Sequence, residues 1–315
     1  MLFQLTRRLL ILLASLAVAS VLVFGFMAVL PGDPAQVALG VNATPELLAR
    51  TRHEFGLDRP LVVRYLDWIG GLLTGDFGRS YVTGERIGPS LVDRYGVTLW
   101  LVGAGMLVAV LIAVPAGVLA AVRHRRISGA VISGLSQLGV AVPGFLAGIV
   151  LVQVFAVSLG LVPSGGWTPP VVDPVEFLLG LILPALSLGL VQGAVLTRYV
   201  RSAVLDVLRE DYIRTARAKG LTPFRALLRH GLRNAAVPVV TVLGLQLTTL
   251  LVGAVVVERV FVIPGLGSLL LDAVGNRDLL VVQDVVMVLV LTVLLVNFLV
   301  DVLYAVLNPR LRQVG

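Results

Sequence analysis

The chain has 315 residues, of which 57% are hydrophobic and only 14% are charged, and its formal net charge is +7. Soluble globular domains carry about 25% charged residues, so this composition excludes an ordinary soluble protein and indicates an integral membrane protein in contact with lipid. The absence of cysteine excludes disulfides, thiolate metal sites and a cysteine nucleophile, and the basic residues lie between apolar stretches, which favours membrane orientation over nucleic-acid binding.

Six apolar stretches are long enough to cross a membrane as helices, which takes about 20 residues each. We expect these spans at 9–30, 97–122, 129–159, 177–197, 234–257 and 285–307. The third comes from an uncharged run of 46 residues, 127–172, which the Gly- and Pro-rich run 163–170 interrupts. Pro115, Pro143 and Pro184 are positions where a span is expected to break or bend. A cleaved signal peptide is the alternative for the first stretch, but its 22 apolar residues exceed the usual number of about 7 to 15.

The charges between the spans predict the orientation, because basic residues mark the cytoplasmic side. Net positive segments precede the first span and follow the second, fourth and sixth, and the most basic of them, 198–233, holds nine basic and three acidic residues. The segments 31–96, 160–176 and 258–284 carry net charges of −1, −2 and −2. We therefore expect a multi-pass membrane protein with both termini in the cytoplasm.

The first outer segment, 31–96, is expected to contain two short helices. Thr44, Pro45 and Glu46 form a helix start, and Gly56 is the expected stop. The second helix is expected over 60–73, with an apolar stripe made of Leu61, Tyr65, Ile69 and Leu72. The segment is interpreted as a lid that packs on its own spans or as a docking surface for an external substrate-binding protein, and these two interpretations are compatible.

The basic loop, 201–233, is expected to form two short helices that meet at Gly220. Alanine and arginine favour helix, Gly220 is expected to end the first helix, and Pro223 is expected to begin the second. Val204, Leu208 and Ile213 form an apolar stripe beside a dense basic face. An interfacial amphipathic anchor is one interpretation. The other is a coupling helix that offers a partner protein a face of small residues, namely Ala216, Ala218 and Gly220.

The basic loop resembles the EAA loop of ABC importer permeases, in which Glu-Ala-Ala is followed, after three residues, by Gly. Here Arg214 and Thr215 replace the Glu and the first Ala, while Ala216 and Gly220 match. These departures are similar to the peptide and nickel branch of the family, which 212–221 and 229–234 match. Further motifs of that branch lie at 30–34, 56–60, 64–65, 75–81, 258–267 and 297–310, the last with Asn308 in place of the usual Asp.

The resemblance implies an all-α integral protein of the bacterial inner membrane with six transmembrane helices, acting as a permease subunit of an ATP-driven importer. It implies three parts: the first helix in 1–30, a helical extracytoplasmic segment in 31–96 and the transport core in 97–315. The implied partners are a second, homologous permease in a heterodimer, two ATPase subunits and an extracytoplasmic substrate-binding protein, all within or beside membrane lipid. The implied ATPase-coupling residues are Tyr212, Arg214, Thr215, Ala216, Ala218, Lys219, Gly220, Leu221 and Pro223.

The chain is not expected to be an enzyme. It lacks the Gly-rich phosphate loop of ATPases, and Lys219 is its single lysine. We therefore expect ATP and Mg²⁺ to be bound by partner subunits, and no catalytic, cofactor or metal site in this chain. His53, His124 and His230 are far apart in the sequence and match no metal-ligand spacing. The expected solutes are di- and oligopeptides, with nickel, glutathione or another small solute as the alternative.

Polar or helix-bending residues inside the spans are candidates for lining the solute path. They are Gln137, Pro143, Gln153, Gln192, Gln246 and Thr248. Hydrogen bonding between helices is the competing explanation for the polar ones. Asp301 is expected to be a structural cap or a salt-bridge partner, because no second acid or histidine lies in the expected spans to relay a proton. This argues against a proton-coupled secondary transporter. An intramembrane enzyme and a non-transporting receptor or scaffold are the remaining alternatives.

Overall fold

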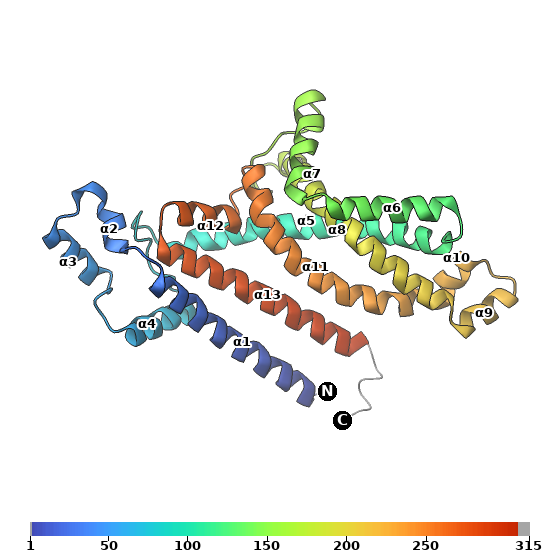
Figure 1. The fold of residues 1–315 in the computed structure, drawn as a ribbon, viewed down its shortest axis with the longest axis horizontal. Helices are drawn as coiled ribbons and strands as arrows, with labels where there is room; N and C mark the ends of the chain where they lie inside the picture. The colour runs from blue at the N-terminus through green and yellow to red at the C-terminus, as the bar shows by residue number, and fades with distance from the viewer. Residues whose placement is uncertain (1, 308–315) are drawn as a thin grey trace. The chain divides into compact units, whose positions relative to one another are not determined.

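The structure of the chain is a computed structural model that describes residues 2–307. Its long helices are α1 (Leu2–Val29), α5 (Ile87–Val122), α8 (Pro174–Leu208), α11 (Leu232–Val260) and α13 (Leu279–Leu307) (Figure 1). Each of the five is long and apolar enough to cross a membrane. The shorter elements are α2 (Pro34–Leu39), η1 (Gly40–Asn42), α3 (Pro45–Glu54), α4 (Leu61–Thr74), α6 (Ile127–Ala141), α7 (Gly144–Leu151), η2 (Val152–Ser158), α9 (Asp211–Ala218), α10 (Pro223–Ala226), η3 (Leu227–Gly231) and α12 (Leu266–Gly275). The prediction of an all-α membrane protein is confirmed.

The third expected span, 129–159, is broken. Figure 1 shows α7 turning away from α6, and the bend between the two segments is 99°. Val142 has an extended backbone, with φ −87° and ψ 121°, as expected for a residue that precedes proline. The expectation of one helix is therefore wrong here, and the expectation of a break at Pro143 is confirmed. Pro115 and Pro184, in contrast, lie inside the uninterrupted helices α5 and α8.

Two helices extend well beyond the apolar windows that predicted them. Helix α5 has 36 residues and begins ten residues before the expected start at Val97. The charges of Asp93 and Arg94 end the apolar window, but they do not end the helix. Buried Leu91, one turn earlier, belongs to a core cluster with Leu266 and residues of α13, and this packing holds the added turns. Helix α8 likewise continues eleven residues past 197, to Leu208.

The chain divides into two compact units that share α5 and α13. The first contains residues 99–263 and the described residues from 296 onward, and the second contains residues 2–98 and 264–295. In the first unit, α5 and α8 pack closely through glycine. A Cβ on Gly117 would lie 2.6 Å from Val200 Cβ, and one on Gly189 would lie 2.4 Å from Val108 Cγ1. Small residues at helix crossings are the usual means by which membrane helices approach each other.

The outer segment begins with the predicted first helix. The Thr44 hydroxyl accepts a hydrogen bond from the Leu47 N–H at 3.3 Å, which caps α3. Gly56 follows its end with a φ of +66°, and the Leu57 N–H donates to the Arg52 carbonyl at 2.8 Å. Together these form a Schellman turn, in which glycine supplies the left-handed residue. The predicted start and stop of this helix are confirmed.

Helix α4 packs on α1 within the second unit. The ring of Tyr65 lies edge-on to Phe24 at a centroid distance of 5.4 Å, and its hydroxyl is 2.8 Å from the Ser20 hydroxyl. Trp68 is half-buried on the same side of α4. Leu61, which we expected in the apolar stripe, is exposed instead. The outer segment thus packs on its own spans, as one of the two interpretations predicts.

A hydrogen bond between distant parts of the sequence fixes α4 to α13. The indole Nε1–H of Trp68 donates to Asp284 Oδ1 at 2.8 Å. Asp284 is fully buried and lies within the apolar helix that begins at Leu279. The expectation that the spans hold no acid besides Asp301 is therefore wrong, because α13 begins earlier than the hydropathy of the sequence indicates.

We predict that Trp68→Phe destabilises the protein. The change keeps most of the apolar surface but removes the donor to Asp284, and leaving a buried acceptor unpaired costs about 1–3 kcal/mol. The measurement is the midpoint of thermal unfolding of the purified protein in detergent. Trp167→Phe is the matched control, since the Trp167 ring packs on Phe177 at 5.2 Å. Equal midpoints for the two variants would contradict the prediction.

Candidate functional site

The basic loop folds as predicted around Gly220. Gly220 has a φ of +91°, its N–H donates to the Arg217 carbonyl at 3.0 Å, and the Leu221 N–H donates to the Ala216 carbonyl at 3.3 Å. This is a Schellman turn at the end of α9. The Thr222 hydroxyl accepts from the Arg225 N–H at 3.4 Å and caps α10, which Pro223 begins. The sequence therefore turns sharply between two short helices.

The first of these helices is shorter than expected. A break at Arg209 and Glu210 separates α9 from α8, so the start of the basic loop is the end of α8. Behind α9, Val204, Ile213 and Leu227 are buried in one apolar cluster, and the predicted apolar stripe is confirmed. This cluster joins α9 to the end of α8 and orients the loop.

The outward face of α9 is polar and basic. Tyr212, Arg214, Thr215, Arg217, Ala218, Lys219 and Gly220 are exposed, while Leu221 and Pro223 are half-buried. The Tyr212 hydroxyl accepts from Asn234 Nδ2 at 2.8 Å, which ties α9 to α11. Arg214 lies 3.3 Å from Asp211 in an exposed ion pair, and such pairs contribute little to stability. The face is thus free to contact another protein.

Ala216 does not share that outward face. It is 8% exposed and packs in the apolar cluster behind α9. The prediction that Ala216, Ala218 and Gly220 form one exposed face is therefore wrong for Ala216. The reason is the helical period: Ala216 follows Ile213 by three residues, so both side chains lie on the buried side of α9. Ala218 and Gly220 remain exposed.

We predict that Ala216→Leu destabilises the protein and that Ala218→Leu does not. A larger side chain at a packed position costs typically about 1–3 kcal/mol, whereas an exposed substitution usually changes stability by less than about 0.5 kcal/mol. The thermal midpoint in detergent measures both. A lower midpoint for Ala218→Leu than for Ala216→Leu would show that the buried side of α9 is assigned wrongly.

The structure does not gather the six candidate path residues on one surface. Gln137, Pro143 and Gln153 are exposed on or beside the broken span, whereas Gln192 and Gln246 are buried. Within the described residues, Gln246 Nε2 and Thr248 Oγ1 are buried and have no hydrogen-bond partner. A third such group, the Ser187 hydroxyl on α8, was not predicted. Serine commonly bonds to its own helix, so no pattern in the sequence distinguishes Ser187 from other serines in the spans.

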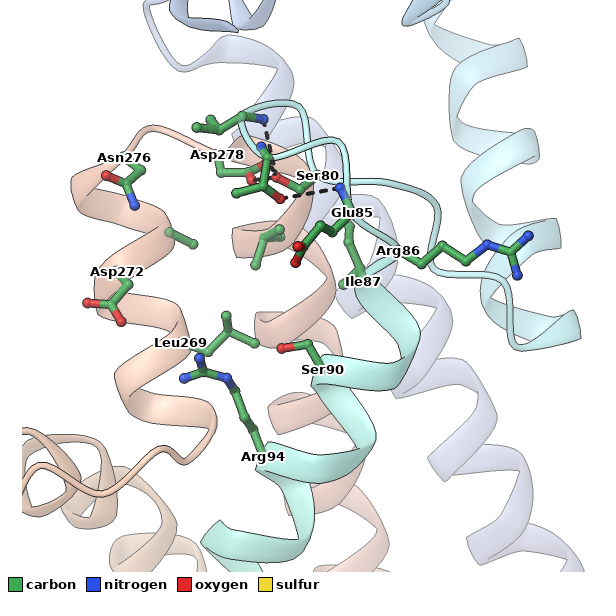
Figure 2. Close-up of a pocket in the computed structure, with 14 residues that line it drawn as sticks. Ser80, Glu85, Arg86, Ile87, Ser90, Arg94, Leu269, Asp272, Asn276 and Asp278 are labelled. Carbon is green, nitrogen blue, oxygen red and sulfur yellow. Dashed lines mark hydrogen bonds between the residues drawn. The ribbon is translucent and has the colours of Figure 1, made fainter. Parts of the chain in front are cut away.

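A second candidate site is a pocket within the second unit, the unit that also contains the outer segment. Its volume is about 190 Å³. It lies between the start of α5, which carries Ser90 and Arg94, and α12, which carries Leu269 and Asp272 (Figure 2). The loop that precedes α5 closes the pocket with Ser80 and Glu85, as the sticks in Figure 2 show. The pocket therefore joins parts of the chain that are far apart in the sequence.

The loop around Ser80 is held by a buried carboxylate. Asp278 accepts hydrogen bonds from the Ser80 hydroxyl and from the Tyr81 N–H, the latter at 3.3 Å. The Tyr81 ring stacks on Phe55 at 4.6 Å, and burial raises the pKa of its hydroxyl above the ordinary value of 10.0. Tyr81 is therefore neutral at physiological pH. The sequence motif 75–81 marks this loop, but no sequence pattern pairs it with Asp278.

Two family descriptions match nearly the whole chain. "Binding-protein-dependent transport system inner membrane component" matches residues 113–313, and the corresponding N-terminal description matches residues 1–102. The chain belongs to this family. It is thus a multi-pass inner-membrane permease of the ABC importer type, a transport subunit and not an enzyme. Members of the family work with an ATPase and a substrate-binding protein, so this permease has partners of both kinds.

Curated relatives match the permease over its full length. The glutathione transport system permease protein GsiC of Salmonella choleraesuis (strain SC-B67) is 43% identical over 312 residues, 99% of each chain. The protein of the same name from Escherichia coli (strain K12) is 42% identical over the same length, again 99% of each chain. These relatives confirm the family predicted from the sequence: the chain is an ABC importer permease of the peptide and glutathione type.

A solved structure supports the fold. A chain of the MetNI methionine ABC transporter, in an inward-facing conformation, aligns with a TM-score of 0.57 and 22% identity. The alignment covers 69% of the permease and 96% of that chain. At this identity the likeness shows a shared fold alone.

Proposed function

We propose that this permease forms, with a homologous second permease, the path by which a binding-protein-dependent importer takes up glutathione or a closely related small peptide. The observation that carries the proposal is the identity of 43% with a glutathione transport permease over 99% of both chains. Di- and oligopeptides, the main solutes expected from the sequence, have less support than glutathione. None of the relatives named above is a nickel permease.

Glutathione uptake by cells tests the solute. The permease is expressed with its partner subunits in a strain that lacks its own glutathione and peptide importers. We expect ATP-dependent uptake of labelled glutathione, with weaker uptake of labelled dipeptides and none of nickel. Uptake of dipeptides without uptake of glutathione would contradict this proposal and would support di- and oligopeptides, the solutes predicted from the sequence.

The proposal also includes two ATPase subunits that drive the transporter, and in it the basic loop of the permease contacts these subunits. Support comes from the hydrogen-bonded turn at Gly220 and from the exposed basic face of α9, which a partner could contact. In this proposal ATP and Mg²⁺ are bound by the ATPase subunits, and the permease binds neither. The coupling residues are the outward ones on α9 and the turn, and Ala216 supports them from behind.

The remaining parts of the proposal concern topology and the path. Both termini and the basic loop lie in the cytoplasm, and the outer segment, 31–96, faces the binding protein. The first helix in 1–30 and the core in 97–315 complete the three-part division. Gln246 and Thr248 are the best-supported path residues, because polar groups left unbonded inside a span are costly unless water or another protein group meets them.

We predict that Ala218→Glu uncouples the transporter without removing it from the membrane. The new carboxylate places a negative charge on an exposed position next to Arg217 and Lys219 and so reverses the local charge that the partner meets. We expect at least a tenfold loss of solute-stimulated ATPase activity in the purified transporter, with unchanged amounts of this chain in the membrane.

Ala218→Gln is the matched control for this change, since glutamine has nearly the size of glutamate without its charge and position 218 is exposed. We expect the control to keep normal activity. Normal solute-stimulated ATPase activity in Ala218→Glu would contradict the proposal that α9 contacts the ATPase.

A further inference from the structure

The pocket between α5 and α12, named the outer pocket (Figure 2), contains a cation that forms no ion pair with any described residue. Arg94 is half-buried, and Figure 2 shows its guanidinium between α5 and α12. Its Nη1 donates to the Ser268 hydroxyl at 3.3 Å, and in the described part of the chain Arg94 forms no ion pair. A guanidinium has five N–H donors. Most of the donors of Arg94 therefore remain available to a ligand.

Ser268 holds Arg94 in place and has no proton left to donate to a ligand. It is 7% exposed, and its hydroxyl donates to the Gly265 carbonyl at 2.9 Å. Because the single hydroxyl proton is used in this way, Ser268 only accepts from Arg94. The arginine is thus positioned by a neutral partner that leaves its charge unbalanced, and a partly buried charge without a counter-ion is costly.

The other charged groups of the pocket do not balance Arg94. Asp278 is engaged by Ser80 and Tyr81, and Asp272 has an interaction partner of its own. Arg86 points away from the pocket (Figure 2). Glu85 is exposed and directs its carboxylate toward the pocket (Figure 2), and no ion pair involves it among the residues described. The pocket therefore presents one available cation and one available anion.

We propose that this pocket binds the zwitterionic amino-acid end of a peptide-like solute, with its carboxylate on Arg94 and its ammonium on Glu85. Arginine binds carboxylates through two parallel hydrogen bonds, which gives both strength and orientation. The volume of about 190 Å³ suits one amino-acid unit and is too small for a folded segment of protein. The inference rests on the proposed function for the class of solute and adds a solute contact at the outer end of the permease.

Direct binding of solute to the purified transporter tests the pocket. The full complex of permeases and ATPases, without the binding protein, is titrated with labelled glutathione. We expect measurable binding by the wild type and at least a tenfold loss of affinity in Arg94→Gln, with a smaller loss in Arg94→Lys. Arg86→Gln is the matched control, because Arg86 points away from the pocket, and it should bind like the wild type.

The ammonium contact has its own test. Glu85→Gln should weaken binding of glutathione but not of N-acetylglutathione, which lacks the ammonium group. Because Glu85 is exposed and outside the helix packing, this variant also tests the pocket if Arg94→Gln does not assemble.

Three results would overturn the inference. One is the absence of binding by a wild-type transporter that nevertheless takes up glutathione in cells, and another is equal affinity in Arg94→Gln and the wild type. The third is a loss of binding-protein docking in Arg94→Gln with unchanged affinity for solute, because the carboxylate on Arg94 would then come from an acidic side chain of the binding protein. Failure of cellular uptake of both glutathione and dipeptides would instead count against the proposed function.

Discussion

A backbone amide or carbonyl group in the hydrocarbon of a membrane has no water to bond to, and an unbonded group there costs several kcal/mol. This requirement explains why the described chain is built from long helices, in which the backbone bonds to itself. The one broken span is the exception that needs an explanation. At Val142 and Pro143 the helix ladder is interrupted, so this elbow is a place that protein or water, and not lipid, is required to cover.

Within the first unit, close helix packing and polar groups occur together. Glycines such as Gly117 and Gly189 bring α5 and α8 into contact, and the tight fit leaves the nearby Ser187 hydroxyl fully buried. Lipid cannot drive helices together by the hydrophobic effect, so such packing and occasional hydrogen bonds determine their association. Polar groups that stay unbonded in this setting are costly unless water or another protein group meets them.

Local signals in the sequence predicted local structure well. The ends of the helices at Thr44, Gly56, Gly220 and Pro223 follow from backbone preferences of single residues, and the structure has all four. Hydropathy located the spans but not the start of α5, because tertiary packing of Leu91 extends the helix past charged residues toward its N-terminus. The bond between Trp68 and Asp284 joins residues 216 positions apart, and the outer pocket is assembled over a similar separation. No local pattern encodes such pairings.

The inward position of Ala216 changes what a partner of α9 would meet. The exposed side of the helix is not a smooth, small-residue surface, because it carries the cations Arg214, Arg217 and Lys219 and the exposed side chain of Tyr212. A protein that fits this surface needs acidic side chains at its rim and a recess for an aromatic ring. Since exposed charges are screened over about 10 Å at 0.1 M salt, an association of the proposed kind would weaken as the ionic strength rises.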